Sequence, residues 1–272
     1  MSATAQPHGR GAPGSLLAAA RAHAGLIALL FALAAVAWWS TADRMAGMDA
    51  GPGTDLGALG WFLSVWVVMM AAMMFPSAAP TVALYARMSR RGAPVAPLLF
   101  AAGYLLTWAA AGLLAYAVFA LGRSALGHQL AWDGAGRWVA GGVLVLAAAY
   151  ELTPLKEACL SKCRSPLGFL VGSWRDGLAG AVNMGARHGA WCVGCCWALM
   201  AGLFALGVMS VAWMAFVAAL IAVEKILPRH PAVTYAVALV LLALGVLLVA
   251  APGSVPGLVV PGHDAGMSGM GS

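Results

Sequence analysis

Long apolar runs with few charges constrain the fold of this chain more than any other sequence feature. Only 9% of its 272 residues are charged, whereas soluble domains carry roughly 25%. One bilayer-spanning helix needs about 20 consecutive apolar residues. Runs near this length occur at residues 16–39, 56–75, 95–121, 138–155, 191–227 and 231–250. The fifth is too long for one helix, and we divide it near Gly202–Gly207. The sequence therefore predicts an all-α, polytopic transmembrane helix bundle with about seven spans.

The apolar runs form one domain with polar ends. Residues 16–250 are expected to be a single transmembrane helical domain. Residues 1–15 are rich in Gly, Pro and Ala and are expected to be disordered, and residues 251–272 form a flexible tail that contains His and Met. A signal peptide is the alternative for the first run. Its length and the lack of a small-residue cleavage site before a polar mature domain favour a retained helix.

Basic residues orient the bundle. With seven spans, most Lys and Arg residues outside the helices fall on one side: Arg10, Arg21, Arg87, Arg90, Arg91, Lys156, Lys162, Arg164, Arg175, Arg187, Lys225 and Arg229. The positive-inside rule then predicts a cytoplasmic N-terminus and an extracytoplasmic C-terminus in a bacterial inner membrane. The same rule explains the net charge of +6. The predicted surroundings are the lipid bilayer, and nucleic acid is not expected as a partner.

Soft metal ligands gather in one short part of the chain. All five cysteines lie there: Cys159, Cys163, Cys192, Cys195 and Cys196. The first two are four residues apart, and the third is three and four residues from the last two, so each set shares a helix face. His188 lies one turn before the second set. Thiolates in this number favour Cu(I) or Zn(II). The alternative is that cysteine serves as a small packing residue.

Methionines mark the second apolar run. Met69, Met70, Met73 and Met74 form two one-turn pairs just before Pro76. Thioethers at this spacing would suit the binding or passage of Cu(I). The alternative is that methionine fills an irregular helix interface created by the proline.

A second set of thioether and imidazole groups falls on the predicted extracytoplasmic side: Met45, Met48, His263, Met267 and Met270. Met-x-x-Met with His and Asp is typical of copper-capturing segments in oxidising compartments. The alternative is a disordered tail that happens to contain methionine.

Two carboxylates end predicted helices on the cytoplasmic side. Glu151 and Glu224 are functional candidates because burying a carboxylate in a membrane is costly. The alternative is an interfacial ion pair, for instance of Glu224 with Lys156 or Arg187.

Three sequence blocks carry a family resemblance: VVMMAAMMFPSAAPTVALYAR, YELTPLKEACLSKCRSPLGFL and GLAGAVNMGARHGAWCVGCCWALM. Together with FALGVMS and AVEKILP, they resemble a bacterial family of predicted metal-binding integral membrane proteins. That family is associated with copper supply to tyrosinase-like enzymes. The resemblance covers residues 56–228. It implies that the family pattern includes Met69–Met74, Pro76, Glu151, Lys156, Cys159, Cys163, His188, Cys192, Cys195, Cys196, Glu224 and Lys225.

The residues and the resemblance together predict an integral membrane protein that binds a metal. We expect Cu(I), with zinc as the alternative ion, and a role in supplying copper to a cuproenzyme. No Ser/His/Asp arrangement and no HExxH motif occurs, so an enzyme is not expected. One alternative is a structural or accessory subunit of a larger membrane complex. Another is a thiol redox protein that uses Cys192 and Cys195.

Overall fold

The regular secondary structure in the part of the chain that the structure describes is all helical, as the sequence predicts. This computed structural model describes residues 13–46, 55–89, 94–126, 132–227, 231–255 and 258. Its α-helices are α1 (Pro13–Met45), α2 (Leu59–Met88), α3 (Ala96–Leu126), α4 (Arg137–Glu151), α5 (Pro154–Arg164), α6 (Pro166–Ser173), α7 (Gly177–Leu206), α8 (Val211–Ile226) and α9 (Pro231–Ala250). A π-helical turn, η2 (Trp132–Gly136), precedes α4, and a 3-10 turn, η3 (Pro252–Ser254), follows α9.

Five of these helices are long and apolar enough to cross a membrane: α1 from Ala24, α2, α3, α7 and α9. The pair α4 and α5 makes a sixth if its bent halves are taken as one span. The predicted division of residues 191–227 matches the helix boundaries, because α7 ends at Leu206 and α8 begins at Val211. Gly207 starts the turn between them with a φ of 112°, which glycine adopts at little cost.

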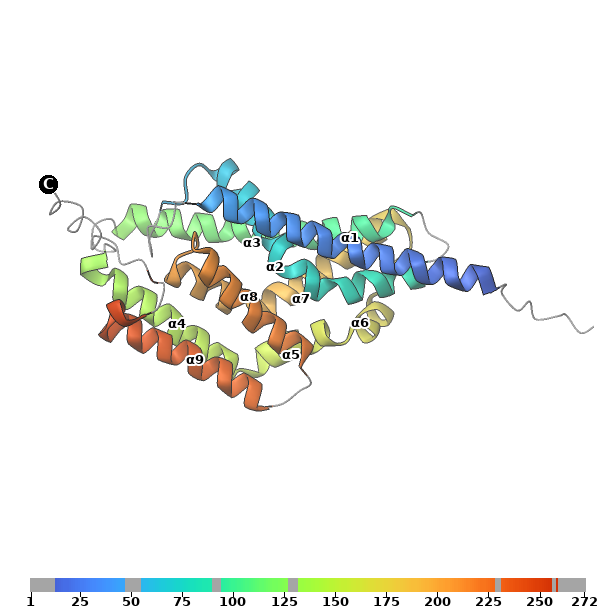
Figure 1. Ribbon diagram of the computed structural model, residues 1–272. Coiled ribbons are helices and arrows are strands. Elements are labelled where there is room, and N and C mark those ends of the chain that lie inside the picture. Colours follow the sequence, from blue (N-terminus) through green and yellow to red (C-terminus); the bar gives the residue numbers. More distant parts are fainter. Residues whose placement is uncertain are drawn as a thin grey trace, which may run out of the picture.

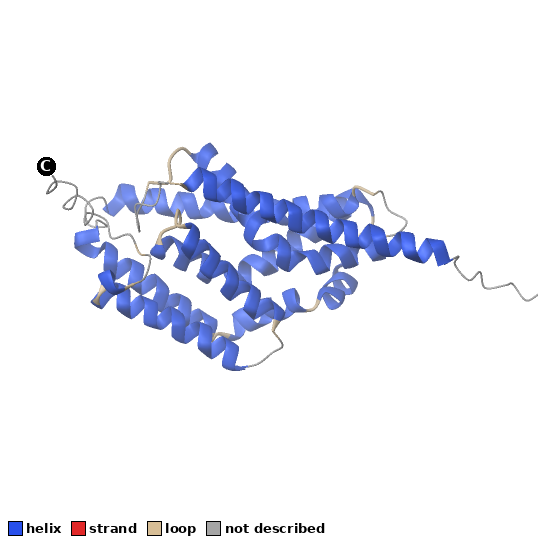
Figure 2. Ribbon diagram, viewed as in Figure 1, coloured by secondary structure: helices blue, strands red, loops and turns tan. Residues whose placement is uncertain are grey.

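The helices run back and forth along the long direction of the bundle (Figure 1), and only short loops connect them in the described chain (Figure 2). The most extensive pairings are α3 with α7, α1 with α2, and α4 with α9. Helix α7 also packs against α4, α5 and α8. It therefore lies at the centre of the bundle, where more than half of its residues are buried.

Glycines bring α3 and α7 into close contact. A Cβ atom on Gly185 would overlap the backbone carbonyl of Phe100, and one on Gly103 would overlap that of Val182. Small residues at a helix crossing allow backbones to approach closely in a membrane, where dispersion contacts replace the hydrophobic effect as the source of attraction. This close packing brings α3 side chains within reach of the centre of α7.

The outer surface of the bundle is apolar. On α3, the side chains of Leu106, Leu114 and Val118 are more than half exposed. Soluble monomers rarely expose apolar surface of this extent. The exposed leucines and the long apolar helices agree with a bundle that is surrounded by lipid.

A sharp break separates α4 from α5. The Thr153 side chain caps α5 by accepting a hydrogen bond from the backbone N–H of Lys156, and Pro154 occupies the first turn. Both features favour a helix start. The two helices are bent by 68° relative to each other. The bend turns α5 toward α7, which it contacts.

Candidate metal centre

Three thiols meet in the middle of α7. The sulfur atoms of Cys192, Cys195 and Cys196 all lie within 4.8 Å of one another, and each side chain is about 1% exposed. The three- and four-residue spacings place them on one helix face, as the sequence indicates. The five cysteines of the chain are all free thiols.

Two more sulfur atoms reach this group from other helices. The Sγ atom of Cys163 in α5 lies 3.8 Å from that of Cys195. The Sδ atom of Met74 in α2 lies 4.0 Å from the Sγ of Cys192. Three helices thus contribute sulfur to one cluster, buried except for the half-buried Cys163, which we call the sulfur cluster: Met74, Cys163, Cys192, Cys195 and Cys196.

The separations within the sulfur cluster suit a shared metal ion. Two thiolates that each lie about 2.3 Å from a metal cannot be more than about 4.6 Å apart. The Cys195–Cys196 distance of 3.3 Å satisfies this limit, as do the Cys163–Cys195 and Cys192–Met74 distances. A thioether suits Cu(I) better than zinc, whose protein ligands are thiolate, imidazole and carboxylate. The donor set therefore fits Cu(I).

Two hydrogen-bonding groups converge on Cys192. Its Sγ lies 2.9 Å from the hydroxyl oxygen of Tyr104 on α3 and 3.1 Å from the Nζ of Lys225 on α8. The ammonium group donates to sulfur, and the tyrosine hydroxyl is able to do the same. Donors that are charged or aimed at one atom stabilise negative charge on it. Cys192 is therefore the sulfur atom best placed to carry a thiolate.

A buried ion triad fixes α5 beside the sulfur cluster. The Nζ of Lys156 lies 2.6 Å from one carboxylate oxygen of Glu224 and also contacts the carboxylate of Glu151. All three side chains are at most 3% exposed. Arg164 adds a 2.7 Å hydrogen bond from its Nε to the backbone carbonyl of Glu224. The triad ties α4, α5 and α8 together, and α5 carries Cys163. The pair of Glu224 with Lys156 is the ion pair that the sequence offered as an alternative to a functional carboxylate.

Two predicted ligands lie beside the sulfur cluster and make other contacts. The Sγ of Cys159 faces Gly194, where an added Cβ would lie 2.7 Å from it. The ring of His188 packs among Phe100, Tyr104 and Phe169 with centroid separations of 5.0–6.1 Å. Its Nδ1 atom has no hydrogen-bond partner among the described residues. A role for either residue as a metal ligand stays a prediction.

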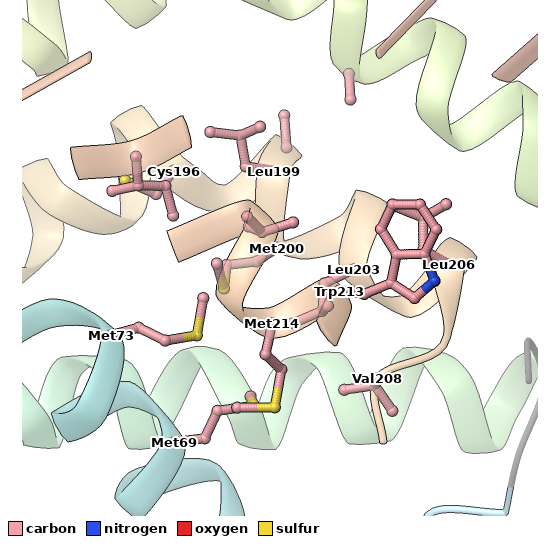
Figure 3. Packing of buried hydrophobic residues seen from close by; sticks show 14 of the residues in the cluster. Met69, Met73, Cys196, Leu199, Met200, Leu203, Leu206, Val208, Trp213 and Met214 are labelled. Atoms are coloured by element: carbon pink, nitrogen blue, oxygen red, sulfur yellow. The ribbon is translucent and has the colours of Figure 1, made fainter. Parts of the chain in front are cut away.

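The four methionines of α2 that the sequence singles out, Met69, Met70, Met73 and Met74, are buried and extend the group of sulfur atoms. Met69, Met70 and Met73 are at most 5% exposed. Figure 3 shows Met73 directed toward Met200 and Met69 toward Met214, with Cys196 at one end of this group. All belong to one packed cluster of side chains. This arrangement fits a thioether path as well as it fits core packing.

Most residues of the predicted extracytoplasmic set fall outside the described part of the chain. Met48, His263, Met267 and Met270 lie in residues whose structure is not described. Met45 ends α1 and is buried at 3% exposure. That these residues form one group on the extracytoplasmic side stays a prediction.

Sequence reasoning did not identify Tyr104, Met200 or Met214 as neighbours of the site. Met200 lies one helical turn after Cys196, so the spacing on α7 contained a usable signal. A tyrosine in an otherwise apolar run was also informative, because a buried hydroxyl requires a partner. For Met214, only the packing of α8 reveals its position.

The chain was also compared with known proteins. A family model described as PpoB2, copper chaperone, matches residues 63–248, more than half of the chain. The chain belongs to this copper chaperone family. The match confirms the resemblance carried by the cysteine and methionine blocks, and it extends into α9. No curated protein and no solved structure matches the chain. For a copper chaperone, a buried group of three cysteines fits copper binding.

Proposed function

We propose that this protein is an integral membrane copper chaperone that binds Cu(I) as cargo and supplies it to a cuproenzyme. The observation that carries the proposal is the sulfur cluster, in which four thiols and one thioether from three helices converge without a disulfide. Soft sulfur ligands select Cu(I), and burial protects this ion from oxidation and from water. The family match supports copper as the cargo.

Cys163, Cys192, Cys195 and Cys196 would provide the thiolate ligands, and two to four of them would bind one ion. Met74 would be the thioether ligand. Cys159 and His188 would adjust or extend this set. Met69, Met70 and Met73, now joined by Met200 and Met214, would pass the ion along the bundle. Met45, Met48, His263, Met267 and Met270 would exchange it at the outer surface. The protein would act as a supplier and not as an enzyme.

We further propose seven membrane passes in a bacterial inner membrane. Helices α4 and α8 are short, yet they run along the same direction as the longer helices (Figure 1). Helix α1 begins at one end of the bundle and α9 finishes at the other, which is what an odd number of passes requires. The distribution of Lys and Arg then favours a cytoplasmic N-terminus and an extracytoplasmic C-terminus.

The test is copper transfer between purified proteins. The detergent-solubilised chaperone is loaded anaerobically with Cu(I), separated from free copper, and mixed with a copper-free tyrosinase-like enzyme. We expect the enzyme to regain activity, because a cargo site must release its ion to an acceptor. A Cys192→Ser/Cys195→Ser variant that underwent the same loading is expected to restore little activity.

Three results would contradict the proposal. Copper that stays on the chaperone in the presence of the acceptor would indicate a resident metal and not cargo. Failure of the wild-type protein to bind Cu(I) at all, with stable co-purification of other membrane proteins, would favour a structural subunit. A disulfide that forms and is reduced in a cycle would favour a thiol redox protein.

A further inference from the structure

A lysine side chain extends into the sulfur cluster. The Nζ of Lys225 lies 3.1 Å from the Sγ of Cys192, 4.0 Å from the Sδ of Met74 and 3.2 Å from the Oγ of Ser77. The two sulfur atoms are themselves 4.0 Å apart. The ammonium group therefore contacts two of the atoms that would bind copper. A positive charge is already present at the point where a Cu(I) ion would bind.

The surroundings of Lys225 make this position unusual. The Lys225 side chain is half-buried, and removing an ammonium group from water is costly unless the group is paired. The adjacent carboxylate, Glu224, is held by Lys156. The groups that face the Lys225 ammonium are a thiol sulfur, a thioether sulfur and a hydroxyl. Its most favourable electrostatic partner is thus a thiolate on Cys192, which also contacts Tyr104.

We propose that Lys225 is a tethered cation that occupies the copper position in the metal-free protein, and that Cu(I) binds by displacing it. This inference rests on the proposed function. During loading, the N–H···S contact between Lys225 and Cys192 breaks as a Cu–S bond forms. At Cys192 one positive charge leaves the sulfur and one arrives. Any further cysteine that binds as a thiolate gives its proton to the ligand that the copper donor releases. No electron is transferred, and the copper donor keeps its own ligands.

A displaced Lys225 ammonium has an alternative position at the end of α8. It lies in the last turn of α8, beside Ile226 and Leu227, which are exposed. The carbonyl groups at a helix C-terminus attract cations. A lysine stem is long and flexible enough to carry its ammonium to the end of a helix and out to a polar interface. The displaced group therefore reaches a favourable environment without a change in the bundle.

The same exchange assists copper release. When copper leaves for an acceptor, a bare thiolate in an apolar site would be costly. Return of the Lys225 ammonium restores its contact with Cys192 and removes that cost. Without the Lys225 ammonium, copper release is slow, because another cation must first reach the Cys192 thiolate. We therefore expect Lys225 to change the rate of copper transfer more than the number of copper ions bound.

Lysine labelling of the wild-type protein tests the displacement. Metal-free and Cu(I)-loaded samples are treated briefly with a membrane-permeant amine-acetylating reagent, and modified peptides are quantified by mass spectrometry. We expect acetylation of Lys225 to rise several-fold on loading. Two lysines serve as internal controls. Exposed Lys162 should react equally in both states, and Lys156, buried in the ion triad, should stay protected in both. Unchanged or reduced labelling of Lys225 in protein shown to contain copper would overturn the proposal.

Release kinetics provide the second test. Copper transfer to a chromogenic Cu(I) chelator is followed for wild-type protein, Lys225→Leu and Lys225→Arg. We expect Lys225→Leu to bind the same amount of copper and to release it about tenfold more slowly, as expected from the loss of a charge-assisted contact. Lys225→Arg retains a cation and should release copper nearly as fast as wild type. Equal rates for all three would refute the role of Lys225.

The two proposals fail in distinguishable ways. If the wild-type protein binds no Cu(I), the proposed function fails. If copper binds and is transferred while Lys225 stays protected, only the displacement by copper is wrong.

Discussion

Replacing Cys195 by serine is expected to remove most of the bound copper. Its Sγ lies between those of Cys163, at 3.8 Å, and Cys196, at 3.3 Å, so it connects the α5 and α7 parts of the sulfur cluster. A serine hydroxyl is a hard ligand that binds Cu(I) poorly. After anaerobic loading and gel filtration, we expect the copper content to fall from about one ion per chain to a small fraction of it. Elemental analysis of the protein fraction measures this directly.

Cys159→Ser is the matched control for that experiment. It makes the same chemical change one helical turn before Cys163, at a sulfur that faces Gly194. From this geometry we expect the variant to keep most of its copper. The sequence-based prediction that Cys159 is a ligand leads to the opposite expectation. Equal copper loss in both variants would show that Cys159 is a ligand, and retention of copper in both would contradict the sulfur cluster as the binding site.

Replacing Lys156 by leucine is expected to destabilise the protein strongly. Lys156 is 2% exposed and is the only cation described between the carboxylates of Glu151 and Glu224. Removal of one partner from a buried ionic group typically costs about 3–5 kcal/mol, because the remaining charge stays buried without compensation. In a thermal unfolding experiment in detergent, this corresponds to a decrease in Tm on the order of 10 °C.

Two further variants serve as controls for Lys156→Leu. Lys162→Leu changes an exposed lysine on the same helix and should shift stability by no more than about 0.5 kcal/mol. The triple variant Glu151→Leu/Lys156→Leu/Glu224→Leu removes both uncompensated carboxylates with the lysine, so it should recover much of the lost Tm. A Tm for Lys156→Leu within the error of wild type would show that the triad does not stabilise the contact of α5 with α4 and α8.

Much of the fold could be read from the sequence, because span length and the lack of charge leave few alternatives. The all-α fold class follows from these two features. The end of α7 near Gly207 was also predictable, since a run of 191–227 exceeds one membrane crossing. What the apolar pattern could not show is that α2 continues through Pro76 and Pro80 to Met88. Proline is tolerated inside membrane helices where neighbouring groups compensate for the lost backbone hydrogen bond.

The site was predictable only within single helices. Helical spacing brings together the three thiols of α7 without any knowledge of packing. Whether α5 joins them depends on the bend after Glu151 and on the packing of α5 against α7, and spacing does not encode either. As a result, Cys163 meets Cys195 while Cys159, one turn earlier, faces a glycine. Lys225 was recognisable as part of a family pattern, but its direction toward Cys192 follows from how α8 packs beside α2 and α7.

The most direct test of this account is X-ray absorption at the copper edge of the wild-type protein after anaerobic loading. We predict an edge typical of Cu(I) and a first shell dominated by sulfur, since thiols and thioethers from α2, α5 and α7 surround the site. A first shell dominated by nitrogen or oxygen would place the copper away from the sulfur cluster. That result would contradict the central claim that this buried cluster carries the cargo.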